Sequence, residues 1–459
     1  MNYLKFSTQK NNYIFNPIDG HIYKYDNDNS VNESSIIKGI ISGENVIEEV
    51  TIGYSFAEIK EAIDKNLKQM TLCVTQNCNL RCNYCVYSGQ FKNFRTHKNI
   101  YMSNRLAIDA ANYFIDHASS ADNLYFTFYG GEPFLNFPLI LATTKYLKSK
   151  LNERVNISIT TNGTLINKEI INFIKEYKVF LSISLDGDQQ THDKHRKFIN
   201  GKGTHEKVMR NIKNLKTDLG ELFHTHISFT ATLSAECDYK ELDLFFINFR
   251  NSVRVSGVQF YGSDSIAPIA GNSKNMSYMI DKFTKGILAH MFDDDHTKEP
   301  YRFPASVVGR GIKSIHLRNV ADKQIYDKTF PLKKHCIPGA TKLFVAPNGD
   351  LFPCEKLDCY KHLKIGNIYS NIDYTRVYQY LMEYVLLRNK FCKDCFLIDI
   401  CDQCFLSASD GERWDEEKMK FYCNNARNEY KKAFSIYVGI LEKDANAFDY
   451  IDKEMDISQ

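Results

Sequence analysis

Six short apolar runs alternate with amphipathic helical segments between residues 71 and 261. The runs are rich in β-branched and aromatic residues, and the segments between them repeat apolar residues at helical spacing. This alternation predicts an α/β fold with a parallel sheet and right-handed crossovers. Six repeats are too few for a closed eight-stranded barrel, so we expect a partial (β/α)6 TIM-like barrel with ligands at the C-terminal strand ends. The six runs cover residues 71–75, 124–129, 157–160, 180–185, 227–232 and 257–261.

Smaller units flank the predicted barrel. Residues 13–15 and 22–25 are typical of two strands joined by a turn, and Ser55 with Glu58 forms a capping box that opens a helix. After residue 331 the chain becomes rich in turns and cysteines. We expect five parts: an N-terminal α+β unit at 1–69, the barrel at 70–275, a bridging region at 276–330, a cysteine-rich domain at 331–430, and a C-terminal helix and tail at 431–459.

The charge balance excludes several classes of partner. The 58 basic and 55 acidic residues leave a formal charge of +3, which is no footprint for a nucleic acid or an anionic membrane. No apolar run is long enough to cross a bilayer, and residues 1–10 lack the apolar segment of a signal peptide. We therefore expect a cytoplasmic protein.

Thirteen cysteines fall mainly into two groups. In a reducing compartment, clustered cysteines bind metal or take part in redox chemistry more often than they form disulfides. The groups are far apart in the chain, so we expect separate sites on separate domains. Cys73, inside the first strand, and the isolated Cys237 are expected to be core residues. The first group also holds Cys78, Cys82 and Cys85, and the second comprises Cys336, Cys354, Cys359, Cys392, Cys395, Cys401, Cys404 and Cys423.

Cys78, Cys82 and Cys85 stand directly after the first predicted strand, at spacings of four and three. Thiolates are soft ligands that suit iron–sulfur clusters and zinc. Three cysteines in one short loop can hold three irons of a cubane and leave the fourth open to a small chelating molecule. The alternative is a zinc knuckle with a distant fourth ligand.

This spacing after a first barrel strand resembles the signature of the radical S-adenosylmethionine (SAM) superfamily. The resemblance implies that the three cysteines hold a [4Fe–4S] cluster that cleaves SAM. It also implies that Gly130, Gly131 and Glu132 contact the methionine amino group, since glycines allow close approach and a carboxylate accepts an ammonium. Further polar residues stand at later strand ends, where the alternatives are turns, helix caps and surface ion pairs. Those with an implied cofactor role are Thr160, Asn162, Ser184, Asp186 and Arg196.

The C-terminal cysteines resemble the SPASM domain, an extension of radical SAM enzymes that modify peptides and proteins. The resemblance implies two auxiliary [4Fe–4S] clusters, three clusters in all; the alternative is a pair of structural zinc sites. Two residues separate Cys401 from Cys404, where the family usually has three. Cys359 is a possible fourth ligand of the first auxiliary cluster; the alternative is an open iron that binds a substrate thiolate. The implied ligands are Cys336, Cys354 and Cys404 for the first cluster, and Cys392, Cys395, Cys401 and Cys423 for the second.

One acidic residue next to these cysteines is a candidate catalytic group. Glu355 directly follows Cys354, and in similar protein-oxidising enzymes an acid at this step acts as a general base. The alternative is a surface acid paired with Lys356.

The substrate class also comes from resemblance. The run 84–89, with Arg95, His97 and Met102 downstream, is similar to maturases of cysteine-rich ribosomal peptides of the ranthipeptide or sactipeptide kind, and the N-terminal unit resembles a leader-peptide recognition element. These resemblances imply that a 5′-deoxyadenosyl radical starts oxidative thioether crosslinking of a precursor peptide, with flavodoxin or ferredoxin as electron donor. Alternatives are carbon–carbon or carbon–oxygen crosslinking, and formylglycine formation in a sulfatase. A non-enzymatic iron–sulfur electron carrier is disfavoured, because a carrier needs no cofactor motifs at strand ends.

Overall fold

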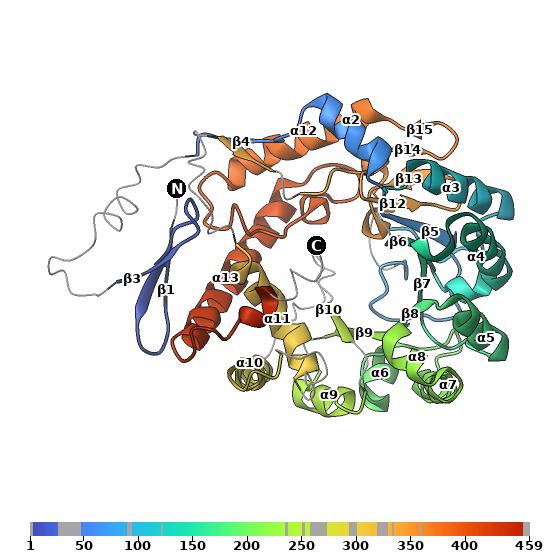
Figure 1. The fold of residues 1–459 in the computed structure, drawn as a ribbon, viewed down its shortest axis with the longest axis horizontal. Helices are drawn as coiled ribbons and strands as arrows, with labels where there is room; N and C mark the ends of the chain where they lie inside the picture. Colours follow the sequence, from blue (N-terminus) through green and yellow to red (C-terminus); the bar gives the residue numbers. More distant parts are fainter. Residues whose placement is uncertain are drawn as a thin grey trace.

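Six parallel strands lie side by side in chain order at the centre of the fold. Figure 1 shows the intervening helices on the outer side of the arc that the strands form, which confirms the predicted partial barrel. The strands are β5 (Gln69–Thr75), β6 (Leu124–Gly130), β7 (Val155–Thr161), β8 (Phe180–Ser184), β9 (Ile227–Leu233) and β10 (Val253–Gly257), and the helices are α3 (Asn104–His117), α4 (Phe137–Leu151), α5 (Lys168–Tyr177), α6 (Gln189–His195), α7 (His205–Leu219), α8 (Glu221–His226) and α9 (Tyr239–Phe246).

The structure is a computed structural model. It describes residues 3–25, 47–89, 94–120, 123–234, 237–249, 253–257, 273–292, 301–318, 329–332, 335–358 and 360–452. Within these ranges, no helix combines the length and apolarity that crossing a membrane requires.

The helices pack on one face of the barrel sheet because burial alternates along its strands. Along β7 and β9 every second residue is buried, so one face of the sheet packs under the helices while the other lines the inside of the arc. Helix α5 begins after Asn167, whose side chain accepts from the Ile170 N–H, and it buries Ile170, Ile171 and Ile174 against the sheet. Each such buried side chain contributes about 1.5–3 kcal/mol.

One strand lies earlier in the chain than predicted. The sixth run was expected at 257–261, whereas β10 occupies Val253–Gly257 and pairs with β9 from Val253↔Phe229 onward. The alternation of Val253 and Val255 with polar residues is the local strand signal, and residues 258–261 lie outside the described part of the chain.

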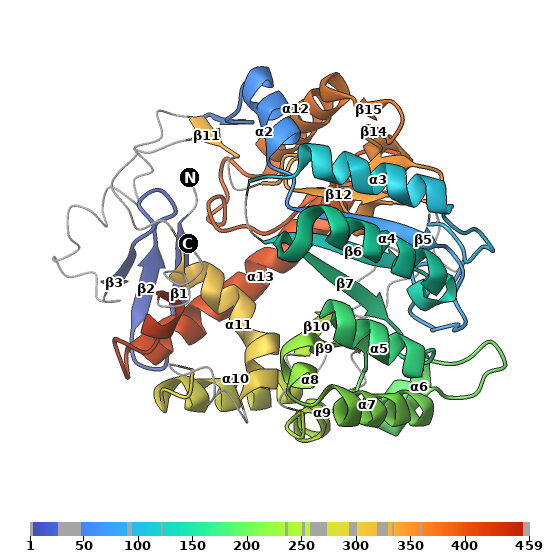
Figure 2. The same cartoon turned by 45° about the vertical axis from the view of Figure 1, so that its right-hand side comes forward.

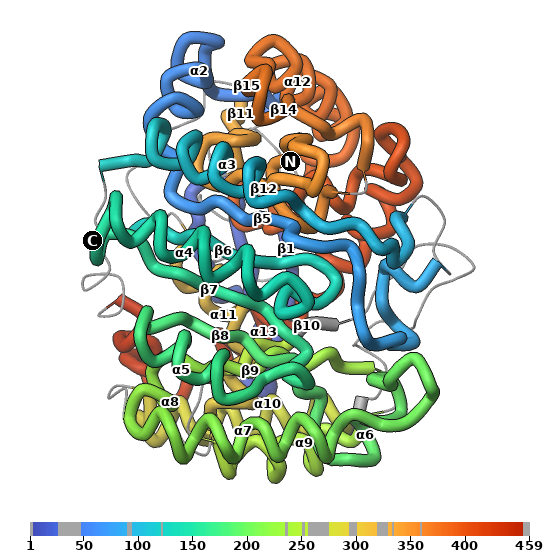
Figure 3. Tube along the Cα trace, turned by 90° about the vertical axis from the view of Figure 1, so that its right-hand side faces the viewer, coloured from blue at the N-terminus to red at the C-terminus, as the bar shows by residue number. Residues whose placement is uncertain are grey.

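The cysteine-rich region continues the barrel sheet instead of forming a separate one. Strand β12 (Lys342–Val345) pairs in parallel with β5, and β13 (Asp350–Phe352), β14 (Gly366–Asn367) and β15 (Asn371–Ile372) follow in antiparallel order. The result is one ten-stranded sheet. In Figure 3 the traces labelled β12, β5, β6, β7 and β8 follow one another across the molecule. Cys73 is fully buried against Phe344 and Phe352 across this junction, which confirms that it is a core residue.

The N-terminal strands pack on the C-terminal helix. β1 (Leu4–Ser7), β2 (Asn12–Phe15) and β3 (Ile22–Tyr25) form an antiparallel sheet, which confirms the predicted hairpin. Phe6 and Phe15 contact Phe434 of α13 (Glu416–Leu441). Figure 2 shows β1 and β2 beside this helix. Helix α13 runs without a break through residue 430, where the cysteine-rich part was expected to end.

The rest of the predicted N-terminal unit lies elsewhere. Helix α2 (Phe56–Lys65) has the predicted capping box and packs against α12 (Tyr374–Phe391). Strand β4 (Glu49–Thr51) pairs with β11 (Thr329–Pro331). Thus residues 4–25 and 49–65 contact different parts of the molecule. Helices α10 (Ser273–Leu288) and α11 (Arg302–His316) connect the barrel side to α13.

Candidate functional site

The cysteine loop after β5 is fixed to the end of β6. The Gly131 N–H donates to the Thr75 carbonyl at 2.9 Å, and the Glu132 N–H donates to the Asn77 carbonyl at 2.8 Å. A Cβ atom on Gly131 would stand 2.0 Å from the Asn77 oxygen, so only glycine permits this approach. The predicted Gly130-Gly131-Glu132 segment therefore lies directly beside the predicted cluster loop.

The three thiols of this loop lie in surroundings that disfavour anionic sulfur unless a positive group is bound. None of the described cysteines forms a disulfide. The Leu80 N–H donates to Cys78 Sγ at 3.4 Å, and His97 Nε2 lies 3.7 Å from Cys85 Sγ. Burial raises the pKa of Cys78 to about 12 and that of Cys82 to about 11, so as thiolates they require a positive partner. A [4Fe–4S] core supplies that charge, and the residues present therefore fit the cluster.

The described ranges contain no group of three or more His, Cys, Asp or Glu side chains arranged to hold a single metal ion. This holds for the Cys78, Cys82 and Cys85 loop and for the described C-terminal cysteines.

Glu132 is fully buried and its carboxylate is bonded within the chain. Oε1 accepts from the Phe134 N–H and the Thr161 hydroxyl, and Oε2 accepts from the Asn162 N–H at 2.7 Å. Burial raises the pKa of Glu132 to about 7 against these donors. The carboxylate thus locks the end of β6 to the end of β7.

Other predicted cofactor residues lie along the same edge. The Asn162 amide donates to Asn79 Oδ1 at 2.9 Å and reaches Cys78 Sγ at 3.9 Å, which connects β7 to the cysteine loop. Thr160 lies one residue before the end of β7, and Ser184 is the last residue of β8.

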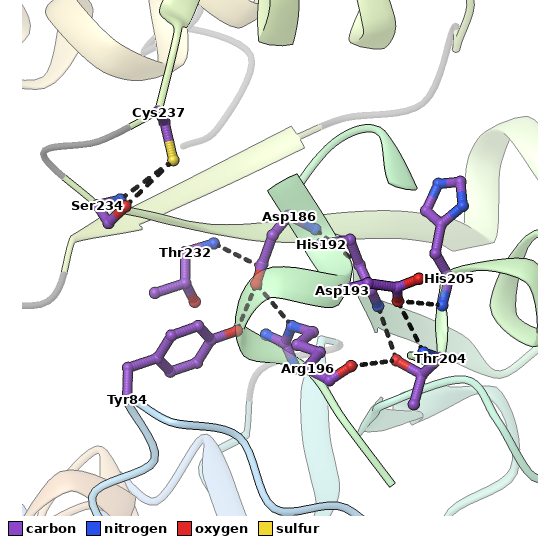
Figure 4. Close-up of polar contacts among 10 residues, drawn as sticks. All are labelled: Tyr84, Asp186, His192, Asp193, Arg196, Thr204, His205, Thr232, Ser234 and Cys237. Atoms are coloured by element: carbon purple, nitrogen blue, oxygen red, sulfur yellow. Dashed lines mark hydrogen bonds and ion pairs between the residues drawn. The ribbon is translucent and has the colours of Figure 1, made fainter. Parts of the chain in front are cut away.

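Asp186 takes part in four hydrogen bonds, three accepted by its carboxylate and one donated by its backbone N–H (Figure 4). Its carboxylate accepts from Arg196 Nε at 2.9 Å, from the Thr232 N–H at 2.9 Å and from the Tyr84 hydroxyl, while its own N–H donates to His192 Nδ1. Burial works against the charge of Arg196, but Asp186 keeps the pKa of that guanidinium above its ordinary value. The structure therefore joins the predicted pair Asp186 and Arg196 and connects it, through Tyr84, to the cysteine loop.

Arg95 joins the cysteine loop to the C-terminal cysteine region. Its Nε lies 2.9 Å from Asp358 Oδ2, its Cζ lies 3.5 Å from the centroid of the Tyr87 ring, and the Tyr87 hydroxyl donates to Asp358 Oδ1. Asp358 closes the short turn after Cys354. The two cysteine groups are therefore connected through a nearly buried ion pair.

The first predicted auxiliary ligands gather around Tyr380. This side chain is fully buried, burial raises its pKa, and charge on Cys404, Cys354 and Cys336 acts on its hydroxyl. Within the described part of the chain the hydroxyl has no hydrogen-bond partner. Cys359 lies outside the described residues.

Glu355 is placed beside this group. Its Oε2 forms an ion pair with Lys342 Nζ at 2.8 Å, whereas the surface alternative had named Lys356 as the partner. Burial raises the pKa of Tyr129 in β6, and the charge of Glu355 adds to this rise.

The second predicted auxiliary group lines one small cavity. The thiols share this cavity with the side chain of Arg388, and Arg427 Nε donates to Cys395 Sγ at 3.4 Å. Two cations beside four thiols suit an anionic thiolate-bound cluster. The four cysteines of the cavity are Cys392, Cys395, Cys401 and Cys423.

Sequence reasoning missed four residues of these sites: Asp358, Tyr380, Arg388 and Arg427. One signal was present for Arg388, which precedes Cys392 by four residues in a helical segment. Asp358 pairs with Arg95 across 263 residues, and such a contact has no local signature.

Comparison with known proteins identifies the family of the barrel region. Residues 72–225 match the model of the radical SAM superfamily. A cysteine-type anaerobic sulfatase-maturating enzyme of Clostridium novyi is 34% identical over 33% of this chain, and the match spans only 41% of that relative. A serine-type anaerobic sulfatase-maturating enzyme of Bacteroides thetaiotaomicron is 25% identical over 76% of this chain and 86% of its own length.

Two solved structures share the architecture. The structure of anSMEcpe with AdoMet and a Cp18Cys peptide is 18% identical, with a TM-score of 0.60 over 82% of this chain and 99% of that chain. Streptococcus suis SuiB bound to its precursor peptide SuiA is 17% identical, with a TM-score of 0.51 over 86% of this chain and 83% of that chain. At these identities the likeness establishes the fold.

The parallel partial barrel, the cysteine loop at its edge and the family match together show that residues 72–225 form a radical SAM domain, of the class that uses SAM and a [4Fe–4S] cluster. The likeness extends beyond that domain, because the Bacteroides thetaiotaomicron relative aligns over 76% of this chain.

Proposed function

We propose that this enzyme is a peptide maturase that oxidatively crosslinks a ribosomally made precursor, forming thioether bonds at cysteine. The observation that carries the proposal is the Arg95–Asp358 ion pair, which holds the loop after Cys85 and the turn after Cys354 together beside the barrel end. A substrate located there would lie between the radical source and the first auxiliary cluster.

The proposed SAM site follows the ends of the strands. Cys78, Cys82 and Cys85 would hold the [4Fe–4S] cluster, which with bound SAM supplies a 5′-deoxyadenosyl radical that removes a hydrogen atom from the substrate. The backbone at Gly130 and Gly131 would lie against the cofactor, because side chains there are excluded. Glu132, Asn162, Asp186 and Arg196 fix these strand ends; Thr160 and Ser184 stand between them and are proposed to contact SAM.

The C-terminal cysteines would hold two further clusters. Cys336, Cys354 and Cys404 supply three ligands to the first, which leaves a position for a substrate thiolate unless Cys359 occupies it. A deprotonated sulfur held there is ready to meet a carbon radical, as thioether formation requires. The cavity group provides four ligands for the second cluster, which would pass the surplus electron outward. An external one-electron donor such as flavodoxin or ferredoxin would start each cycle.

Glu355 is proposed as the base that takes the substrate proton. It lies next to Cys354 and beside Tyr129, at the side of the barrel where the substrate is proposed to lie. The Lys342 ion pair would orient its carboxylate.

The three-stranded N-terminal sheet is proposed to bind the leader of the precursor. Among the described residues, its outer strand β3 pairs on one side only, with β2, and an extended peptide can add to such an edge. The fold shared with SuiB, which was solved with its precursor SuiA, supports a peptide substrate.

The second candidate is formylglycine formation in a sulfatase. The relatives from Clostridium novyi and Bacteroides thetaiotaomicron, named as sulfatase-maturating enzymes, favour it. The chemistry at the barrel would be the same up to hydrogen abstraction.

One assay separates the two. Anaerobically reconstituted enzyme is incubated with SAM, dithionite and either a cysteine-rich precursor peptide encoded beside the enzyme or a sulfatase-derived cysteine peptide, and the products are analysed by mass spectrometry. Crosslinking keeps the sulfur, removes two hydrogens and blocks alkylation of that cysteine, whereas formylglycine formation removes the sulfur. Turnover of the sulfatase peptide alone would reject the crosslinking proposal, and 5′-deoxyadenosine without any peptide product would reject both substrates.

A further inference from the structure

Arg388 is a buried cation that faces the four-cysteine cavity. Its side chain is fully buried within α12, and Nη1 lies 4.0 Å from Cys401 Sγ. Its Nε and Nη2 atoms have no hydrogen-bond partner in the described part of the chain. The cavity beside the guanidinium is lined by Cys392, Cys395, Cys401 and Cys423.

A guanidinium in this position is costly without an anion. Among the described residues no carboxylate lies within 4.0 Å of Arg388, and its strongest charge partners are Tyr384, Cys392 and Cys401. Taking a charge out of water costs several kcal/mol unless a counter-charge and hydrogen bonds replace the solvent. Since Tyr384 donates its hydroxyl to the Gln403 carbonyl and burial raises its pKa, the tyrosine stays neutral. The counter-charge must therefore lie in the cavity.

The second cation of this site is different. Arg427 is half-buried, and besides donating to Cys395 Sγ it donates to the Asn424 side chain and the Phe391 carbonyl. Its charge is partly screened by solvent and its donors are used. Arg388 is the cation whose unused N–H groups point to a missing anion.

We propose that Arg388 is the built-in counter-charge of the second auxiliary cluster and that it raises the reduction potential of this cluster. The inference rests on the proposed function, which assigns a [4Fe–4S] cluster to the four thiolates. Such a cluster carries two negative charges when oxidised and three when reduced, so a fixed cation stabilises the reduced form more. The electron added comes from one-electron oxidation of the substrate radical, and Arg388 exchanges no proton because it stays charged.

The first auxiliary group has a different buried neighbour. There the fully buried polar group is the Tyr380 hydroxyl. Three lysines also act on the thiols of that group, Lys342 on Cys354, and Lys356 and Lys418 on Cys404. What distinguishes Arg388 is that its unused N–H groups belong to a buried guanidinium at the thiol-lined cavity.

The test is a redox titration followed by EPR, in full-length protein whose Cys78, Cys82 and Cys85 are alanine, so that only the auxiliary clusters report. Arg388→Met removes the charge at similar volume, and Arg388→Lys keeps the charge. Arg376→Met, on the same helix and paired with Glu383, is the matched control. We expect Arg388→Met to weaken reduction of one cluster at least tenfold, about 59 mV for one electron. In Arg388→Lys and Arg376→Met, the equilibrium constant for reduction of this cluster should stay within a few-fold of the parent value. In Arg427→Met, this constant should change less than in Arg388→Met.

Each outcome bears on the inference. An unchanged potential with full iron content in Arg388→Met overturns it and leaves the cluster assignment intact. If Arg388→Met loses about four irons while Arg388→Lys keeps them, the need for charge is supported. Loss of iron in both variants would mean that the shape of arginine matters and would overturn the counter-charge role. If the parent itself holds only one auxiliary cluster and Cys392→Ala changes nothing, the cluster assignment fails, and the inference fails with it.

Discussion

Arg95 and Asp358 form a nearly buried ion pair, 2.9 Å long, between the loop after Cys85 and the turn after Cys354. Both side chains are at least nine-tenths shielded from solvent, with 10% and 5% exposed. The Tyr87 ring covers the guanidinium, and its hydroxyl donates to the same carboxylate. This pair joins the two cysteine groups in addition to the pairing of β12 with β5.

Replacing Asp358 by Asn should lower the free energy of unfolding by about 3–5 kcal/mol, because it leaves the Arg95 charge buried without a partner. Denaturant unfolding under anaerobic conditions measures the change. The exposed pair Lys65–Glu61 is the control, and Glu61→Gln should cost less than about 1 kcal/mol. Equal small losses in the two variants would show that Arg95 does not depend on Asp358.

Reconstituted protein should contain about twelve irons per chain if all three sites hold cubanes. Replacing Cys78, Cys82 and Cys85 together by alanine should remove about four irons and abolish 5′-deoxyadenosine formation. Cys73→Ala is the matched control, because this buried cysteine is not a proposed ligand. Iron analysis and chromatography of the nucleoside provide the readouts, and stoichiometric zinc in place of iron would contradict the cluster assignment.

Glu355→Gln should slow peptide product formation at least tenfold while 5′-deoxyadenosine formation changes less than twofold. The reason is that removal of the substrate proton is needed for the peptide product but not for cleavage of SAM, and a general base contributes about 10²–10⁴-fold. Lys342→Met removes only the ion partner and should have a smaller effect. If both products slow equally in Glu355→Gln, the residue supports the site without acting as a base.

Cys359→Ala decides the coordination of the first auxiliary cluster. With an open iron, the variant should keep about twelve irons and full crosslinking. A cysteine-containing peptide should then change the absorption or EPR spectrum of the cluster, whereas the same peptide with serine should not. Loss of about four irons would instead identify Cys359 as the fourth ligand.

The docking of the N-terminal sheet should depend on the charge of Glu442. Oε1 of this residue accepts from Thr8 at 2.8 Å, Asn11 at 2.6 Å and Tyr13 at 2.9 Å. Partial burial opposes the charge, but hydrogen bonds from Asn11, Thr8 and Tyr13 lower the pKa of Glu442 below its ordinary value. A lowered carboxyl pKa stabilises the docked state above the unfolded pKa of about 4.5, and this contribution disappears as pH falls through the folded pKa.

Hydrogen exchange of residues 4–25 should therefore be constant between pH 6 and pH 8 after correction for intrinsic rates, and Glu442→Gln should speed it a few-fold throughout, a loss on the order of 1 kcal/mol. Glu429→Gln, an exposed acid of the same helix paired with Lys432, is the control. Unchanged protection in Glu442→Gln would mean that the contacts of Phe6 and Phe15 with Phe434 hold the sheet alone.

The barrel was predictable because its signal is local. Apolar periodicity placed five of the six strands within about three residues, and the capping box at Ser55 and Glu58 located the start of α2. The sixth strand was placed too late, because a short apolar run does not fix a strand boundary. Cysteine spacing named the groups that the structure brings together, since ligand spacing is also a local property.

Contacts across long stretches of chain were not predictable. The β5–β12 pairing, the position of residues 4–25 on α13 and the Arg95–Asp358 pair all join segments more than 250 residues apart. Such contacts follow from the whole packing arrangement and have no periodicity to reveal them. Arg388 was missed for a different reason: an arginine in a helix is usually a surface residue, and only its burial shows otherwise.

The pairing of β5 with β12 has a consequence for synthesis of the chain. β5 begins at residue 69 and its partner β12 at residue 342, so the ribosome must add about 270 residues before that edge can be covered. At roughly 5–20 residues per second, this takes on the order of 15 to 50 seconds. During this time the nascent barrel exposes a β-strand edge and three cysteines, which makes it a substrate for chaperones and vulnerable to oxidation and edge-to-edge association. The first cluster can therefore enter a barrel with a covered β5 edge only after the ribosome has released β12. Slower translation would lengthen the time in which the exposed edge can aggregate.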